Sequence, residues 1–271
     1  MGKALVNHFY TMGWNIVTLT RNGHHTDLSH DITDIPYDLG NDINAKLLER
    51  VDYLIHAAYA KDNLALNVAA AERLLDAARA AQVKQVLFIS SMSAHNNATS
   101  IYGRQKYAIE KMFLESGRLC IRPGLIAGNG GIFRNILSTA GRFHIIPIIS
   151  GGNQPVQLIK LDDLVSAIGE IIISDKSRII TVAHPTQITY KKLFKIVFER
   201  AKIQVLFLHL PYWLAYVIFW VIGQGLPSIG ISHDNLAGLK NLQSSDTTKE
   251  MTELGLNLPP IEDYIATIKL G

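Results

Sequence analysis

Short apolar stretches alternate with amphipathic helical patterns along the first two thirds of the chain, and this alternation constrains the fold most. The apolar stretch 52–58 precedes a helical pattern at 67–83, and the apolar stretch 84–91 precedes another at 101–116. The other members of the series are helical patterns at 2–13, 43–51 and 161–173 and apolar stretches at 15–20, 118–124 and 178–184. Strands that alternate with helices run parallel, and parallel sheets carry helices on both faces. The sequence therefore predicts an α/β protein with a Rossmann-like, doubly wound parallel sheet.

The series opens on a helix, with no strand before it. In a doubly wound dinucleotide-binding fold, the first strand and its glycine-rich turn carry the pyrophosphate site. Gly2 is then interpreted as the last glycine of such a turn, and the strand and most of the turn are expected to be missing. That absence predicts a gap or a rearrangement beside the strand 15–20. The alternative is that Gly2 is only the residue after the initiator.

The domain organisation follows from where the alternation ends. We expect a nucleotide-binding Rossmann-like domain over residues 1–185 and a smaller, mostly helical substrate cap over 186–271, with 124–156 contributing to the cap. Within the cap, residues 205–223 are nearly all apolar and close to the length of a membrane span. They include His209 and Pro211, and we favour a buried or membrane-surface helix over a span.

Composition excludes some classes of partner and of location. The net charge of +3 is small and not clustered, so nucleic-acid binding is not expected. Cys120 is the single cysteine, which fits a reducing compartment, and the first 21 residues do not resemble a secretory signal. We therefore expect a cytoplasmic protein. The histidines are not spaced as metal ligands, so no metal is expected.

Tyr102 and Lys106 are four residues apart in a predicted helix and so share one face of it. Free tyrosine has a pKa near about 10, and a nearby ammonium would lower it. Ser91, at the end of the preceding strand, has a hydroxyl suited to orienting a substrate oxygen, because open α/β sheets bind ligands at these strand ends. Such pairs are common in helices, so the spacing alone is a weak signal that the serine strengthens.

Five segments together resemble the extended or atypical short-chain dehydrogenase/reductases, the NAD(P)-dependent epimerase/dehydratase group. They are DYLIHAAY, NVAAAERLLDAARAAQVKQVLFISS, SIYGRQK, IRPGLIAGNG and VQLIKLDDLVSAI. The resemblance runs over nearly the whole chain and is strongest from residue 14 to residue 170. Each segment alone is weak, but together they are specific.

The resemblance implies a role for each matched residue. Tyr102 would be the general acid/base, Lys106 would lower its pKa and bind the nicotinamide ribose, and Ser91 would bind the reacting oxygen. Asn67 would brace the site, although a helix N-cap is an equally good interpretation. The expected cofactor-binding residues are Gly2, Arg21, Asp38, Leu39, Ala57, Ala58, Tyr59, Lys106, Pro123, Gly124 and Leu125.

The cofactor preference depends on Arg21, which follows the second strand of the resembled fold. An acid there would accept the adenosine ribose hydroxyls, whereas an arginine suits a 2′-phosphate. No acid lies in the segment TLTRNGHH. We therefore expect NADP in preference to NAD, with a solvated loop arginine as the alternative.

The resemblance has departures that narrow the function. Met92 and Ser93 follow Ser91 where the sugar-nucleotide dehydratases of this group carry Asp-Glu, which argues against dehydration. The leading hypothesis is an NAD(P)-dependent oxidoreductase or epimerase acting on a nucleotide sugar or a related small-molecule carbonyl or alcohol. The alternative is a non-catalytic dinucleotide-binding or assembly protein on the same fold. A homodimer and peripheral membrane contact through 205–223 are further hypotheses.

Overall fold

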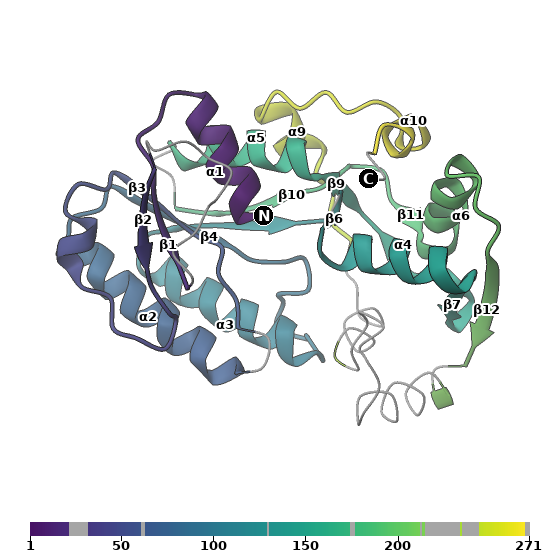
Figure 1. Cartoon of the computed structure of the whole chain (residues 1–271), viewed down its shortest axis with the longest axis horizontal. Helices are drawn as coiled ribbons and strands as arrows, with labels where there is room; N and C mark the ends of the chain where they lie inside the picture. Colours follow the sequence, from purple (N-terminus) through teal and green to yellow (C-terminus); the bar gives the residue numbers. More distant parts are fainter. Residues whose placement is uncertain are drawn as a thin grey trace. The chain divides into compact units, whose positions relative to one another are not determined.

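The computed structural model describes residues 1–21, 32–60, 63–128, 130–173, 177–211, 213–214, 234 and 244–268 (Figure 1). The helices are α1 (Gly2–Thr11), α2 (Leu64–Ala80), α3 (Ile101–Glu115), α4 (Gly131–Phe143), α5 (Leu161–Ile172), α6 (Tyr190–Arg200), α9 (Thr248–Glu253) and α10 (Ile261–Ala266), with short 3-10 turns η1 (Ala45–Leu48) and η2 (Ser150–Gly152). The strands are β1 (Val17–Thr20), β2 (Thr33–Pro36), β3 (Tyr53–His56), β4 (Gln85–Ile89), β5 (Leu119–Pro123), β6 (Leu125–Ala127), β7 (Ile145–Ile149), β8 (Pro155–Val156), β9 (Leu158–Lys160), β10 (Ile179–Val182), β11 (Ile188–Thr189) and β12 (Leu206–Leu210).

The central sheet has the strand order β10-β5-β4-β3, and its pairs β3–β4 and β4–β5 are parallel. Helices α2 and α3 lie on one side of this sheet, and α1 and α5 lie on the other (Figure 1). The predicted α/β class, with a Rossmann-like parallel sheet between two helical layers, is confirmed.

The core of this layer is built where α2 and α3 meet the sheet. Val86 and Phe88 of β4 pack with Ala71 and Ala78 of α2 and with Phe113 of α3, and all five are almost completely buried. All five side chains of β4 are buried, as a parallel strand covered on both faces requires. The small side chains of α2 bring that helix close to the strand, and the phenylalanines fill the remaining volume.

Strands β1 and β2 form a sheet of their own, separate from the central sheet. β1 pairs only with β2, in parallel and in the register Val17↔Thr33, and the described residues contain no strand that joins β1 to β3. Of the gap or rearrangement expected beside residues 15–20, the described residues show a gap, between β1 and β3. The sequence pattern did not predict β2, and of the helical pattern at 43–51 only Ala45–Leu48 are helical, as the 3-10 helix η1.

The chain divides into two compact units, which are described separately. Unit 1 comprises Met1–Ser90, Gln105–Arg122 and Leu161–Ile180, and unit 2 comprises Ser91–Arg104, Pro123–Lys160 and Thr181–Gly271. The domain boundaries predicted from the sequence remain a prediction.

Unit 2 contains several short strands besides its helices. β6 pairs with β9, and β7 pairs with β12 in parallel. The helix expected over 205–223 is wrong at its start, because Leu206–Leu210 form the strand β12, where four apolar or aromatic side chains and His209 alternate between the two faces of a sheet. Residues 212 and 215–223 lie outside the described residues. Among the helices that the structure describes, none has the length and hydropathy needed to cross a membrane.

Candidate functional site

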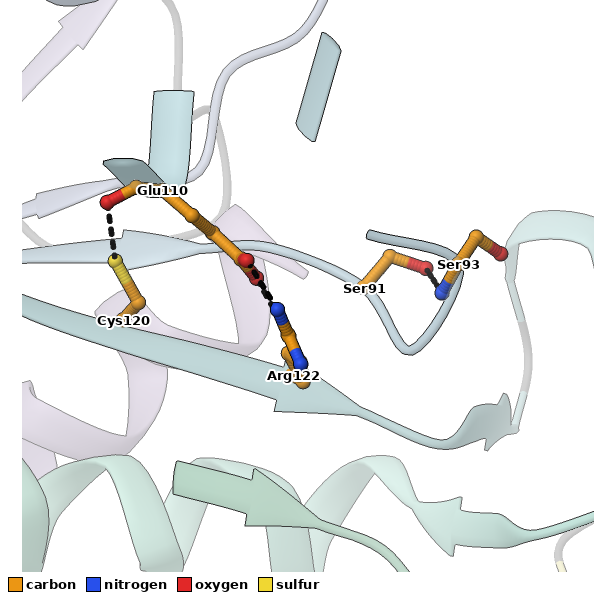
Figure 2. A network of polar contacts seen from close by, with 5 residues as sticks. All are labelled: Ser91, Ser93, Glu110, Cys120 and Arg122. Atoms are coloured by element: carbon orange, nitrogen blue, oxygen red, sulfur yellow. Dashed lines mark hydrogen bonds and ion pairs between the residues drawn. The ribbon is translucent and has the colours of Figure 1, made fainter. Parts of the chain in front are cut away.

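The predicted catalytic serine and tyrosine lie together in unit 2. Ser91 follows the end of β4, and Tyr102 lies in the first turn of α3. The Ser91 Oγ accepts a hydrogen bond from the Ser93 amide over 3.1 Å, which fixes the loop that carries it (Figure 2). Tyr102 is also hydrogen-bonded with the Ser91 side chain. The structure therefore brings these two side chains into contact.

The electrostatics of Tyr102 favour its protonated form. Burial raises the pKa of Tyr102 above its ordinary value of 10.0, and the hydrogen bond with Ser91 opposes this rise. The phenol is therefore neutral at pH 7, which suits a group that donates a proton to a developing alkoxide. The lowering of this pKa by Lys106, which the resemblance implies, stays a prediction.

Gly103 explains how α3 approaches the Ser91 loop so closely. A Cβ at this position would clash with the Ser93 carbonyl oxygen and would lie 2.8 Å from the Ser100 Oγ. The Gly103 amide donates to the same Ser100 Oγ over 3.0 Å. Any larger residue after Tyr102 would push the start of the helix away from the serine.

Asp234 is a contact residue of this helix that sequence reasoning missed. Its carboxylate accepts hydrogen bonds from the Ile101 and Tyr102 amides, at 2.6 Å and 2.9 Å. A negative charge at this end complements the helix dipole and satisfies two amides that have no partner within the helix. No local motif marks Asp234, because the contact joins positions more than 130 residues apart.

Lys106, one turn further along α3, is held in a buried environment in unit 1. Its Nζ donates to the Ile89 carbonyl oxygen over 2.7 Å and lies 4.5 Å from the centre of the Phe88 ring and 5.3 Å from that of Tyr59. Burial lowers the pKa of Lys106 from 10.5 to about 8, and the charge of Glu110 partly opposes this. Two aromatic faces and a carbonyl thus stabilise an ammonium with little access to water.

The loop after β3 meets α2 and α3 at this lysine. Ala57, Ala58 and Tyr59 follow β3 directly, and the Tyr59 hydroxyl donates to the Gln105 Oε1 over 3.5 Å. Asn67 holds the end of the loop from both sides: its Oδ1 accepts from the Ala60 amide over 2.8 Å and its Nδ2 donates to the Ala60 carbonyl over 2.9 Å.

The N-cap interpretation of Asn67 is wrong. The helix starts earlier, at Leu64, and Asn63 is its N-cap, with a side chain that accepts from the Leu66 amide. Asn67 is therefore inside the helix, where its buried amide group bonds the loop backbone instead of the helix backbone. Its geometry is that of a bracing residue.

The sequence also did not predict a buried ion pair between Glu110 and Arg122. Glu110 is only 1% exposed, and its carboxylate accepts from the Arg122 Nε over 2.8 Å and from its Nη2 over 2.5 Å (Figure 2). The Cys120 Sγ contacts the Glu110 carbonyl oxygen at 3.9 Å, and burial raises the pKa of this thiol. The pair joins α3 to β5. A signal was present in the sequence, since Glu110 lies one helical turn after Lys106, but its partner is on another element.

The residues predicted near the adenine and the ribose lie at ends of elements in unit 1. Gly2 is the first residue of α1, where a Cβ would meet nothing within 4 Å. Arg21 is exposed and directly follows β1, and residues 22–31 lie outside the described residues. The Asp38 Oδ1 accepts from the Gly40 amide over 2.9 Å, and the Leu39 carbonyl accepts from Arg73 over 2.7 Å.

The last predicted segment, Pro123–Leu125, crosses from β5 to β6 in unit 2. The Gly124 amide donates to the Val182 carbonyl, and the Leu125 amide donates to the Gln157 carbonyl. A Cβ at Gly124 would lie 2.6 Å from that Gln157 oxygen, so only glycine allows the two backbones to approach this closely.

Each unit, taken by itself, carries polar groups of the kind that can bind the nicotinamide end of a dinucleotide. Unit 1 has the buried cation of Lys106, and unit 2 has the hydroxyls of Ser91 and Tyr102. In addition, the Ser90 Oγ is buried and has no partner among the described residues. A buried hydroxyl without a partner at a strand end indicates space for a polar ligand or water.

Known proteins resemble this chain in sequence pattern and in fold. Residues 1–183 match the family model of the NAD dependent epimerase/dehydratase family. No curated protein sequence matches significantly.

Solved structures share the fold at low sequence identity. MoeE5 in complex with UDP-glucose and NAD is 19% identical, with a TM-score of 0.74 over 98% of this chain and 93% of that one. A nucleoside-diphosphate-sugar epimerase from Staphylococcus aureus is 14% identical, with a TM-score of 0.77 over 98% and 95% of the two chains. TunA, a NAD-dependent NDP-hexosamine 5,6-dehydratase, is 13% identical, with a TM-score of 0.73 over 97% and 91%.

Proposed function

Because the chain belongs to the NAD dependent epimerase/dehydratase family, an enzyme family, we propose that it is an oxidoreductase or epimerase acting on a nucleotide sugar or a related carbonyl or alcohol substrate. The observation that carries this proposal is the contact between Ser91 and Tyr102 at the start of α3, with Lys106 one turn further along the same helix. The nucleotide sugars named in the neighbouring structures support the substrate class.

Ser91, Tyr102 and Lys106 have different roles in the proposed chemistry. When bound, the dinucleotide would accept or supply the hydride. Ser91 would hold the reacting oxygen of the substrate, and Tyr102, neutral because burial raises its pKa, would donate a proton to that oxygen during reduction. The buried ammonium of Lys106 would bind the ribose hydroxyls and favour the tyrosinate left after proton transfer.

The remaining residues would hold the cofactor. Ala57, Ala58 and Tyr59 would line it, with Asn67 keeping their loop in place. Asp38 and Leu39 would lie beside the adenine, and Pro123–Leu125 would border the nicotinamide. The absence of the Asp-Glu pair after Ser91 favours a reductase or an epimerase over a dehydratase.

The experiment that tests the catalytic assignment is Tyr102→Phe, with Tyr107→Phe on the same helix as the matched control. Purified protein is given NADH or NADPH and a panel of nucleotide sugars, and both dinucleotide absorbance and sugar products are measured. We expect Tyr102→Phe to lower turnover by about 10²–10⁴-fold and to leave dinucleotide affinity nearly unchanged. Unchanged turnover in this variant would remove Tyr102 from the mechanism. Tight dinucleotide binding without turnover of any substrate by the wild type would favour the non-catalytic alternative.

The preference for NADP is a finer part of the proposal and rests on Arg21, which is exposed at the end of β1. A guanidinium there suits a 2′-phosphate, and no acid precedes it on the strand. Arg21→Ala should weaken NADP binding about tenfold and NAD binding much less, as measured by calorimetry. Equal losses would leave the preference unsupported. A cytoplasmic location and a homodimer also remain proposals.

A further inference from the structure

The sheet formed by β7 and β12 has an outward face made only of apolar side chains. In the parallel register Leu206↔Ile145 to Leu210↔Ile149, alternate residues of both strands point to the same side. On one side lie Ile146 and Ile148, which are completely buried, and beside them the half-buried Phe207 and the exposed His209. The apolar face on the other side consists of Ile145, Pro147, Ile149, Leu206, Leu208 and Leu210.

Several side chains of this apolar face are exposed to solvent. Leu206 is 64% exposed, Leu208 42% and Ile145 40%. Phe143, just before β7, is 57% exposed, and Trp213, just after β12, is 67% exposed. A parallel sheet is normally covered on both faces, and a sheet face that is left in water normally carries polar residues. A continuous exposed apolar surface therefore indicates that something binds there.

Basic residues outnumber acidic ones in the segments that carry the apolar face, although Lys192 and Lys195 form ion pairs with Glu262 and Glu199. Because the strands are parallel, both begin at the same end of the sheet, where Arg142 and Lys202 lie exposed just before them. In the segments 124–160 and 186–214 the only acid is Glu199. The basic residues of these segments are Arg134, Arg142, Lys160, Lys191, Lys192, Lys195, Arg200 and Lys202.

The sequence that continues from β12 is also apolar. No Asp, Glu, Lys or Arg occurs between Lys202 and Asp234, and the stretch 211–222 contains tyrosines and tryptophans at positions 212, 213, 216 and 220. Leucine, tryptophan and tyrosine beside basic residues are the composition of protein surfaces that enter the boundary between lipid headgroups and acyl chains.

We propose that the apolar face of β7 and β12, with Arg142 and Lys202 at its edge, is a docking surface for an anionic lipid membrane. The leucines and Trp213 enter the interface, and the basic side chains contact acidic headgroups. A second copy of the chain is the less suitable occupant. In a two-fold pairing both copies bring the same surface, which offers the basic edge residues no acidic partner.

Co-sedimentation with vesicles tests the proposal. The full chain is mixed with vesicles of phosphatidylcholine alone or with about 30 mol% phosphatidylglycerol, at low and high salt. We expect binding to the anionic vesicles that weakens with salt. Leu206→Ser combined with Leu208→Ser should weaken it at least tenfold, because two exposed apolar side chains are lost from the interface. Arg142→Glu and Lys202→Glu should each weaken it at least fivefold.

The controls replace matched residues in unit 1. Met12→Ser and Ile173→Ser, both 52% exposed, and Lys111→Glu on α3 should leave vesicle binding unchanged. Each variant is accepted only if its melting temperature stays near that of the wild type, and Leu206→Thr replaces a serine variant that fails.

Binding that persists in the leucine variants, or that does not need anionic lipid, overturns the proposal. So does a concentration-dependent dimer of the wild type that the leucine variants abolish, because it would assign the surface to a second copy.

Discussion

Replacing Lys106 with methionine should separate the stability of this protein from its function. The side chain keeps its approximate length but loses the buried charge. A pKa lowered from 10.5 to about 8 means that keeping the ammonium charged in the fold costs about 3 kcal/mol. Methionine also loses the hydrogen bond to the Ile89 carbonyl, which lowers the stability of the variant by about 1–3 kcal/mol. At pH 7.5 Lys106→Met should therefore be as stable as the wild type or slightly more stable, although it loses turnover.

The pH dependence gives the sharper test. Between pH 8 and 10.5 the unfolded chain keeps the proton on Lys106 and the folded protein does not, so the free energy of unfolding of the wild type rises with pH. Relative to Lys106→Met it should gain about 3 kcal/mol from pH 7.5 to 10.5, measured by urea denaturation followed by circular dichroism. Lys111→Met, an exposed lysine on the same helix, should show no such difference. A pH-independent difference for Lys106→Met would refute the reasoning.

Two further substitutions test the interior of unit 1. Burial, with a contribution from Lys106, lowers the pKa of His56 to about 3, so the stability that depends on its neutral form is present above pH 6.5 and is lost as the pH falls towards 3. His56→Leu should reduce this acid-induced loss by up to about 5 kcal/mol, measured as the change in unfolding free energy between the two pH values. Glu110→Gln should cost about 3 kcal/mol, because it leaves the Arg122 guanidinium without its carboxylate, and the double change with Arg122→Met should recover part of that loss. Equal stability of the Glu110→Gln variant and the wild type would show that the pair contributes nothing.

The parts of the fold that follow from local pattern were predictable from the sequence. Strands β3, β4 and β5 and helices α2 and α3 are marked by runs of apolar residues or by helical periodicity, and their order specifies a parallel sheet. β2 was missed because Thr33–Pro36 has three polar or turn-forming members and only one large apolar residue. β12 was mistaken for a helix because its apolar run gives no periodicity, and only pairing with β7 selects the strand.

In the candidate site, too, some residues are marked by local sequence pattern and others only by contacts across the fold. Ser91, Tyr102 and Lys106 lie near one another in the chain, so the Tyr–Lys spacing, the preceding serine and the family resemblance together select them as candidates. Asp234 and Arg122 act through contacts across the fold, and nothing adjacent to them in the sequence indicates the partner. Asn67 lies between these cases: its position was marked by the motif, but its bonds to Ala60 depend on the helix beginning at Leu64.

The separation of β1 from β3 leads to a prediction about dinucleotide binding. Helix α1 begins at Gly2, and its N-cap residue, Met1, makes no side-chain capping bond. The amides of a helix's first turn, at the positive end of the helix dipole, bind a pyrophosphate when a turn holds it there. Among the described residues, β1 and β3 lie in separate sheets, and each is paired with a single strand.

A variant extended before Gly2 by a strand of about five residues and a glycine-rich turn would give both strands a shared neighbour, with each new backbone hydrogen bond contributing about 0.5–1.5 kcal/mol net. We expect this variant to melt several degrees higher than the present chain and to bind NAD or NADP at least tenfold more tightly, measured by calorimetry. An extension of equal length with glycine–serine sequence is the matched control. If the strand-bearing variant and the control have the same melting temperature and the same affinity, the edges of β1 and β3 do not accept a strand.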